Sequence, residues 1–313
     1  MTISLSCEIT MSKDQDKAWL YQPHLIKKLE KKFAEEVSGL AKFKTPGTPR
    51  GNILRDVDNT VDKEKHARFR SGVGTLLYLV KHTRPDIANS VRELSKAMDG
   101  PNPAAYKELL HTIKYVLDTK DLALKMFINV EVKDGAVVWR VVVFSDSDWA
   151  DDPETRISIT GYIIYFMGVA ICWKSKSQKG VTLSSSEAEL VALSEAVKEV
   201  RFIHQVLTSI GIEVETPIVV RVDNIGAIFM SNSVAISNAT KHVDIRSRFV
   251  VQYVMNGTVK VIFVRSENND SDICTKNLVS RLHHKHAEKV VVVKGTEEYP
   301  YGEVKSQDPI QVG

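Results

Sequence analysis

The 313-residue sequence lacks several features that would assign it to a specialised class of protein. Its three cysteines, Cys7, Cys172 and Cys274, are too few and too far apart for a disulfide framework or a zinc site. No apolar run approaches the roughly 20 residues of a membrane span, and the first residues lack the zones of a signal peptide. The net charge of +3 is too small to indicate nucleic-acid binding by itself. We therefore expect an intracellular, soluble protein with no membrane partner.

Apolar periodicity divides the chain into three parts. Residues 1–121 predict a short strand and then mainly helices, with an extended connector at 44–62 that is rich in Pro and Gly. Residues 122–279 predict strand hairpins, the first with its turn at 133–135, followed by alternating helices and strands. This order is typical of a mixed α/β sheet covered by helices. Residues 280–313 predict a disordered tail in which three histidines, His283, His284 and His286, are solvated.

Four acidic residues lie at element boundaries in the α/β part. Asp146 and Asp223 each close a β-branched run, and ligand sites collect outside such strand ends. Glu189 lies beside the apolar stripe of a predicted helix, where a carboxylate is costly unless it is paired or coordinated. Asp272 lies near the start of the last predicted helix, where the helix dipole favours a negative charge. Carboxylates that converge predict a site for two Mg²⁺ ions, about 4 Å apart, that cleaves phosphodiesters.

Each of these residues also has a purely structural interpretation. Asp223 is equally well placed to cap the helix that follows it. Glu187 and Asp270 are acidic neighbours of Glu189 and Asp272, and we expect neither neighbour to be a ligand. The joint occurrence of four such carboxylates in this order of elements favours the metal site.

Several motifs resemble the ribonuclease H domain of Ty/copia-type LTR retrotransposon polyproteins. They are SDSDWADD at 145–152, the run at 160–199, VDN at 222–224, TKHVDIR at 240–246 and SDICTK at 271–276. The preceding part is similar to the region after the polymerase palm, through TPGTP at 45–49, the run at 78–91 and that at 114–124. The resemblance covers residues 3–279. It implies a ribonuclease H-like mixed five-stranded sheet at 122–279, preceded by a mainly helical remnant of the thumb or connection region.

The resemblance implies a metal-dependent endonuclease that cuts the RNA strand of RNA–DNA hybrids in a cytoplasmic particle or the nucleus. Its metal ligands for Mg²⁺, or Mn²⁺ as a substitute, correspond to Asp146, Glu189, Asp223 and Asp272. Hybrid contacts would come from 2′-hydroxyl and phosphate recognition. The candidates for these contacts are Ser185, Asn224, Lys241, His242, Arg246 and Arg248. For the last four, a solvated helix face is the alternative interpretation.

The sequence departs from its relatives in two respects. No histidine lies shortly before Asp272, a position where many cellular ribonucleases H have one. The chain also lacks the Tyr-x-Asp-Asp turn and the earlier palm aspartate of a polymerase; the run 149–152 imitates that turn only superficially. We expect no polymerase activity from this chain alone, and a partner that supplies the missing palm and fingers. The alternative functions are an inactive remnant that binds nucleic acid and, ranked lower, a transposase or integrase, in which the glutamate would come last.

Overall fold

The computed structural model describes residues 2–3, 7–56, 58–232 and 241–301. Its central sheet has the order β11-β10-β7-β8-β9. The strands are β7 (Val141–Asp148), β8 (Ile159–Phe166), β9 (Val169–Ser177), β10 (Ile218–Val222) and β11 (Val259–Phe263). β7, β8 and β9 form an antiparallel meander, whereas β10 runs parallel to both β7 and β11. This is the five-stranded mixed sheet that the sequence predicts, with β7 at its centre.

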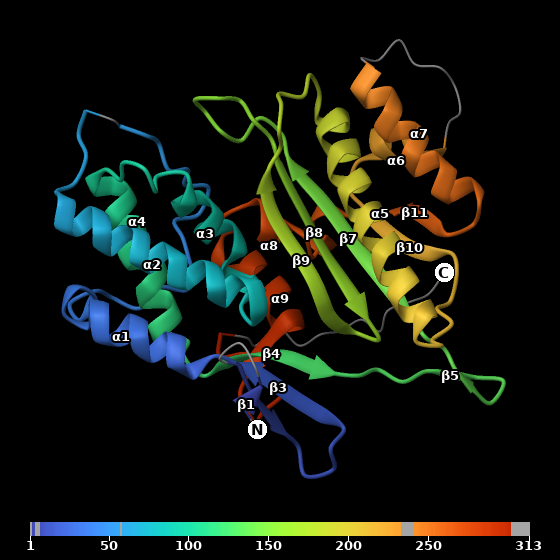
Figure 1. Cartoon of the computed structure of the whole chain (residues 1–313), viewed down its shortest axis with the longest axis horizontal. Coiled ribbons are helices and arrows are strands. Elements are labelled where there is room, and N and C mark those ends of the chain that lie inside the picture. Colours follow the sequence, from blue (N-terminus) through green and yellow to red (C-terminus); the bar gives the residue numbers. More distant parts are fainter. Residues whose placement is uncertain (1, 4–6, 57, 233–240, 302–313) are drawn as a thin grey trace.

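Helices cover both faces of this sheet (Figure 1). Successive side chains of a strand point to opposite faces, so β7 contributes Val143 to one core and Phe144 to the other. On the first face, α5 (Ser185–Ser209) buries its apolar stripe, and α7 (Lys241–Met255) packs beside it. The short α8 (Asp272–Thr275) and then α9 (Ser280–Val290) pack on the second face. The carboxyl end of β7 is therefore held between two packed layers.

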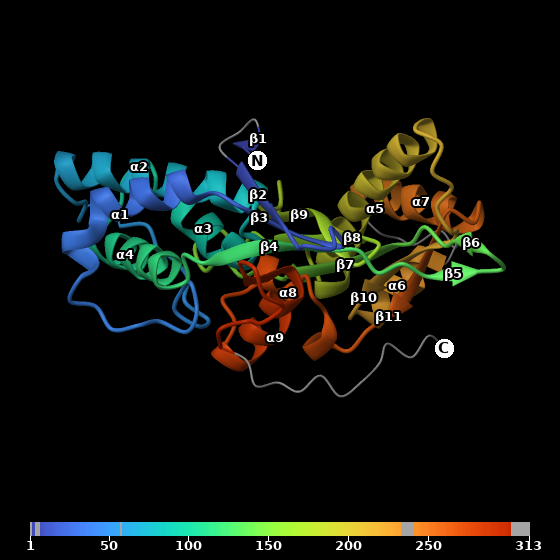
Figure 2. The ribbon, with the colours of Figure 1, turned by 90° about the horizontal axis from the view of Figure 1, so that it is seen from below.

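A cluster of helices forms the other end of the molecule, opposite α5 and α7 (Figures 1 and 2). It consists of α1 (Pro23–Val37), α2 (Lys63–His82), the 3₁₀ turn η1 (Pro85–Ile87), α3 (Ala88–Ser95) and α4 (Pro103–Asp118). Their apolar faces share one core, in which Phe33, Phe69 and Leu109 are almost completely buried. The helical periodicity predicted for this region is confirmed. The remaining short elements are α6 (Ile225–Asn232) and the 3₁₀ turn η2 (Ser266–Asn268).

A second five-stranded sheet, absent from the sequence prediction, joins the two ends of the chain. Its order is β1-β2-β3-β4-β12, with β1 (Thr2–Ile3), β2 (Cys7–Met11), β3 (Lys17–Tyr21), β4 (Leu122–Phe127) and β12 (Val291–Val293). The predicted hairpin turn at 133–135 does form, between β5 (Val132–Lys133) and β6 (Ala136–Val137). However, β4 pairs with β3 and β12 rather than with β7, so the strands that flank this hairpin belong to different sheets.

The prediction of a disordered, solvated tail is wrong for residues 280–301. These residues form α9 and β12, and the side chains of His283, His284 and His286 are buried. Each imidazole has a partner: the carbonyl of Asp86, the carbonyl of Lys44 and the carboxylate of Asp270, at 2.7–3.0 Å. Polar side chains can be buried when they are hydrogen-bonded. The polarity of these histidines therefore did not predict their exposure. None of the described helices has the length and apolar character to cross a membrane.

Candidate metal-binding active site

Three aspartates from three different elements converge at one edge of the central sheet. Asp146 lies in β7, Asp223 directly follows β10, and Asp272 begins α8. β7 and β10 are parallel neighbours, so their carboxyl ends lie at the same edge. One carboxylate oxygen from each aspartate lies within 4.8 Å of the other two. The structure therefore brings together three of the four predicted carboxylates.

Glu189 reaches the same region from α5. Its Oε1 accepts a hydrogen bond of 3.1 Å from the backbone N–H of Ser147, the residue after Asp146. Its Oε2 is buried and has no hydrogen-bond partner in the described part of the chain. A buried oxygen of this kind is costly unless an ion or a water molecule satisfies it. Glu189 thus offers a fourth oxygen beside the three aspartates.

Burial and neighbouring carboxylates raise the pKa values of Glu189, Asp223 and Asp272. Burial, and then the charges of Asp146 and Asp223, raise the pKa of Glu189 well above its ordinary value. Burial and then Asp146 raise the pKa of Asp272 to about 8, and the same two causes raise the pKa of Asp223. Neighbouring buried negative charges are tolerable when a cation neutralises them. Because oxygen ligands are also those that Mg²⁺ prefers, the residues present fit a Mg²⁺ site.

Lys276 places its own positive charge inside this cluster. Its Nζ lies 3.2 Å from Oδ2 of Asp146 and 3.0 Å from Oδ1 of Asp272. The hydroxyl of the preceding Thr275 donates to Asp146 as well. Burial opposes the charge of Lys276, but the carboxylates of Asp146 and Asp272 raise the pKa of the ammonium well above its ordinary value. Lys276 is therefore a tethered cation that offsets part of the repulsion between the aspartates.

The structure resolves the two interpretations of Asp223. Asn224, not Asp223, caps α6: its Oδ1 accepts a 3.0 Å hydrogen bond from the N–H of Ala227. The same oxygen accepts a hydrogen bond from the hydroxyl of Ser186 in the first turn of α5, at 3.1 Å. Capping by Asn224 leaves the Asp223 carboxylate available to the cluster.

The two acidic neighbours have other partners, as expected. Glu187 accepts a 2.8 Å hydrogen bond from the N–H of Leu183, just before α5. Asp270 is buried against His286, Lys289 and Tyr165, at 3.0, 2.5 and 3.2 Å. These contacts satisfy Asp270 on the far side of the Asn269–Asp272 turn.

The predicted nucleic-acid contacts lie on α5, directly before α6 and on α7. Ser185 is exposed in the first turn of α5, close in sequence to the Ser186 hydroxyl that contacts Asn224. On α7, Arg246 donates to Ser194 and Glu195 of α5, at 2.6 and 3.0 Å, and Arg248 pairs with Asp244 at 2.8 Å. The side chains of Lys241 and His242 fall outside the described residues.

Sequence reasoning missed Lys276 and Asp148, although both left a signal. Lys276 follows Asp272 by four residues, a spacing that pairs side chains on a helix. Asp148 shares a face of β7 with Asp146 because it is two residues further on. Burial, and then the nearby charge of Asp151, raise the pKa of Asp148 to about 7.

No family model matches the chain, but comparisons with known proteins find relatives. Over 226 residues, 72% of the chain, it is 31% identical to the retrovirus-related Pol polyprotein from transposon RE2 of Arabidopsis thaliana. Over 276 residues, 87% of the chain, it is 29% identical to that from transposon TNT 1-94 of Nicotiana tabacum. The chain is homologous to a segment of the copia-type, retrovirus-related Pol polyproteins.

The match covers only part of these polyproteins: 15% of the RE2 protein and 20% of the TNT 1-94 protein. The resemblance drawn from the motifs is confirmed for the copia-type Pol family. Among solved structures, the chain is similar to LC11-RNase H1, isolated from compost, with 16% identity and a TM-score of 0.35. That match covers 44% of this chain and 92% of the LC11 chain.

Proposed function

We propose that this chain is a metal-dependent endonuclease that cleaves the RNA strand of RNA–DNA hybrids. The observation that carries the proposal is the convergence of Asp146, Asp223 and Asp272 beside the buried, unpartnered oxygen of Glu189. The central mixed sheet and the homology to copia-type Pol polyproteins support it. In the polyprotein, the partner of this chain would be the palm and fingers region that carries the polymerase site.

The four carboxylates would hold two Mg²⁺ ions, or Mn²⁺ in their place. When bound, such ions lower the pKa of an attacking water and stabilise the leaving oxygen. The chain itself supplies position: the Ser147 N–H fixes Glu189, and Thr275 fixes Asp146. Because Asp146 lies in β7 and Asp272 begins α8, packed elements would set the spacing of these two carboxylates before substrate binds.

Recognition of the hybrid would use polar and basic residues of α5 and α7 and the residue before α6. Ser185 and Asn224 lie in the first turn of α5 and directly before α6, and we propose that they contact 2′-hydroxyls of the RNA strand. Arg246 and Arg248, with Lys241 and His242, are the proposed contacts to phosphates of the complementary strand.

The test is cleavage of a labelled RNA–DNA hybrid in Mg²⁺ by the parent chain and by Asp146→Asn and Glu189→Gln. We expect cleavage by the parent and a loss of at least a hundredfold in both variants, because each removes an ionised ligand. Glu215→Gln is the matched control, since Glu215 lies in an exposed ion pair with Arg140. Equal cleavage by all four proteins would place the activity elsewhere.

Binding without cleavage would point to the alternative, an inactive remnant that binds nucleic acid. The same protein preparation tests the prediction that this chain alone has no polymerase activity. Incorporation of dNTPs on a primed template would contradict it.

A further inference from the structure

Asp272 of the carboxylate cluster lines a pocket of about 410 Å³ that it shares with a segment from the N-terminal part of the chain. The near wall includes Asp148, Asp272 and Lys276. The far wall is the connector between α1 and α2, represented by Arg50, Gly51 and Asn52. The pocket therefore joins the proposed active site to a segment that the sequence alone assigns only as a linker.

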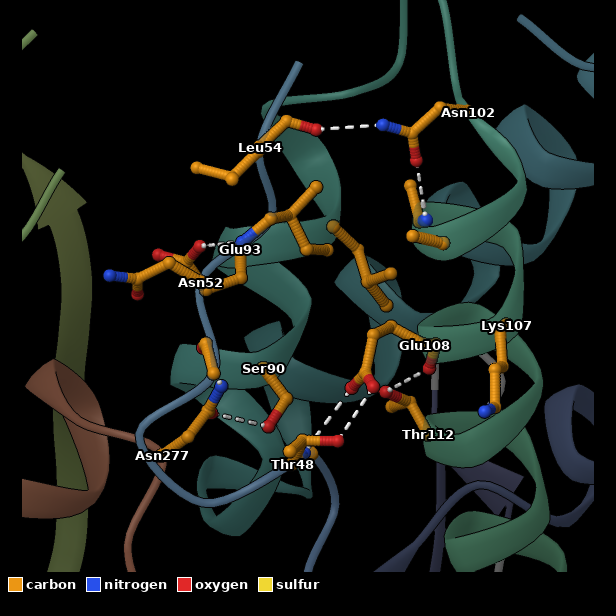
Figure 3. A pocket seen from close by; sticks show the side chains of 16 residues that line it. Thr48, Asn52, Leu54, Ser90, Glu93, Asn102, Lys107, Glu108, Thr112 and Asn277 are labelled. Carbon is orange, nitrogen blue, oxygen red and sulfur yellow. Dashed lines mark hydrogen bonds between the residues drawn. The ribbon is translucent and has the colours of Figure 1, made fainter. Parts of the chain in front are cut away.

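Asn277, the residue after Lys276, fixes the connector to the active site. Its backbone oxygen accepts a 2.8 Å hydrogen bond from the N–H of Arg50, and its side-chain Nδ2 donates to the carbonyl of Gly51 at 3.0 Å. The Oδ1 of Asn277 accepts in turn from Ser90 on α3 at 2.9 Å, as Figure 3 shows. The backbone of Arg50 is thus fixed beside Asn277, the residue that follows Lys276.

The helical cluster contacts the connector at two further points, which Figure 3 shows in its view of a neighbouring pocket. The N–H of Ile53 donates to Glu93 of α3 at 3.1 Å, and the hydroxyl of Thr48 donates to Glu108 of α4 at 2.6 Å. The connector also reaches the loop after β7, because Asn52 donates to the Asp151 carboxylate at 3.2 Å. These contacts hold the described part of the connector against the helices and the loop after β7.

The backbone of Arg50 adopts a conformation that a side chain disfavours. Its φ is +58°, in the left-handed region, and the following Gly51 closes a turn onto the carbonyl of Thr48 at 2.9 Å. Residues that carry a side chain populate this region sparsely, and the hydrogen bonds of the turn hold Arg50 in it.

The charges of the pocket leave Arg50 available for a ligand. Arg50 and Lys276 are the cations among its lining residues, and Lys276 is already paired with Asp146 and Asp272. The Arg50 side chain is exposed, and no ion pair or side-chain hydrogen bond to its guanidinium occurs within the described ranges. A polyanion that approaches this acidic edge needs a positive contact beside it, and a guanidinium suits a phosphate.

We propose that Arg50 binds a phosphate of the RNA strand next to the scissile phosphate, so that the connector completes the substrate site of the nuclease. This proposal rests on the proposed function, since it assumes that an RNA–DNA hybrid enters this pocket. Arg50 acts as a binding residue: it affects substrate affinity rather than the cleavage step.

The experiment compares the full-length parent chain with Arg50→Gln, Arg50→Lys and Arg55→Gln. Arg55 is exposed in the same connector but does not line the pocket, which makes Arg55→Gln the matched control. Arg50→Gln should raise KM for the hybrid about tenfold, the loss of one charge-assisted hydrogen bond, with kcat within twofold. Arg50→Lys should recover most of the affinity, and Arg55→Gln should resemble the parent.

A binding measurement separates this proposal from the nuclease assignment. In an Asp146→Asn background, fluorescence anisotropy with a labelled hybrid gives Kd over a range of salt concentrations. Adding Arg50→Gln should weaken binding. It should also lower the magnitude of the slope of log K against log salt by about 0.9, because one phosphate contact fewer releases fewer counterions.

Two results would overturn the role of Arg50. One is an unchanged KM and salt slope in Arg50→Gln while the parent still cleaves, which leaves the nuclease assignment intact. The other is an equal loss in Arg50→Gln and Arg55→Gln, which would indicate only general attraction to the connector. If instead the parent does not cleave but binding still depends on Arg50, the nuclease assignment fails and the phosphate contact stands.

Discussion

Removal of the Lys276 charge tests the electrostatics of the carboxylate cluster. In Lys276→Met, the aspartates lose a cation that lies 3.0–3.2 Å from two of them. Removing one partner of a buried ion pair costs about 3–5 kcal/mol. The Lys276 side chain is 32% exposed, so solvent screening reduces this to about 2 kcal/mol. For a chain of this size, that corresponds to a fall in Tm of roughly 5 °C.

The assay is thermal unfolding at pH 8.5, above the pKa of about 8 of Asp272, once in EDTA and once in Mg²⁺. We expect the fall in EDTA and its recovery in Mg²⁺, because a bound divalent ion replaces the missing ammonium. Lys198→Met is the control, since Lys198 forms an exposed pair with Glu195 on α5. A Tm in EDTA equal to that of the parent would refute the view of Lys276 as the counterion of the cluster.

Two further predictions concern the same region. In EDTA, the free energy of unfolding should fall as pH rises from about 4 to 8, because the folded chain keeps the Asp272 proton to about pH 8 whereas the unfolded chain loses it near 3.8. The slope would be about 1.4 kcal/mol per pH unit, and urea unfolding at pH 5 and 8 measures it; greater stability at pH 8 would contradict the raised pKa. Gly161→Ala should destabilise the protein by about 1–3 kcal/mol and reduce cleavage, because its Cβ would lie 2.5 Å from Thr275. Gly180→Ala, where nothing lies within 4 Å, should be neutral, and equal Tm values for the two would argue against tight packing of α8 on β8.

Two central strands, β7 and β10, were predictable because each is a short β-branched run followed by an aspartate. The runs before Asp146 and Asp223 predicted two strands of one sheet, and the structure makes them parallel neighbours with their ends together. The helix of Glu189 was equally clear from its apolar stripe, with Ser184 as its cap. For these carboxylates, local pattern and tertiary position agree.

The rest of the fold and of the site could not be predicted from the sequence, because it depends on contacts between segments that are distant along the chain. β4 has an ordinary strand pattern, and only its pairing with β3 and β12 shows which sheet it joins. The sequence predicted a solvated His283 because a single sequence cannot reveal its hydrogen bond to the distant carbonyl of Asp86. The role of the connector was hidden for the same reason: its link to Asn277 spans more than 220 residues.

Metal binding tests the central claim most directly. Crystals of the full chain soaked in Mn²⁺ should give anomalous difference peaks among the carboxylates of Asp146, Glu189, Asp223 and Asp272, with oxygen–metal distances of about 2 Å. An absence of such peaks at saturating Mn²⁺, or peaks bound only to other acidic residues, would contradict the assignment of this cluster as the active site.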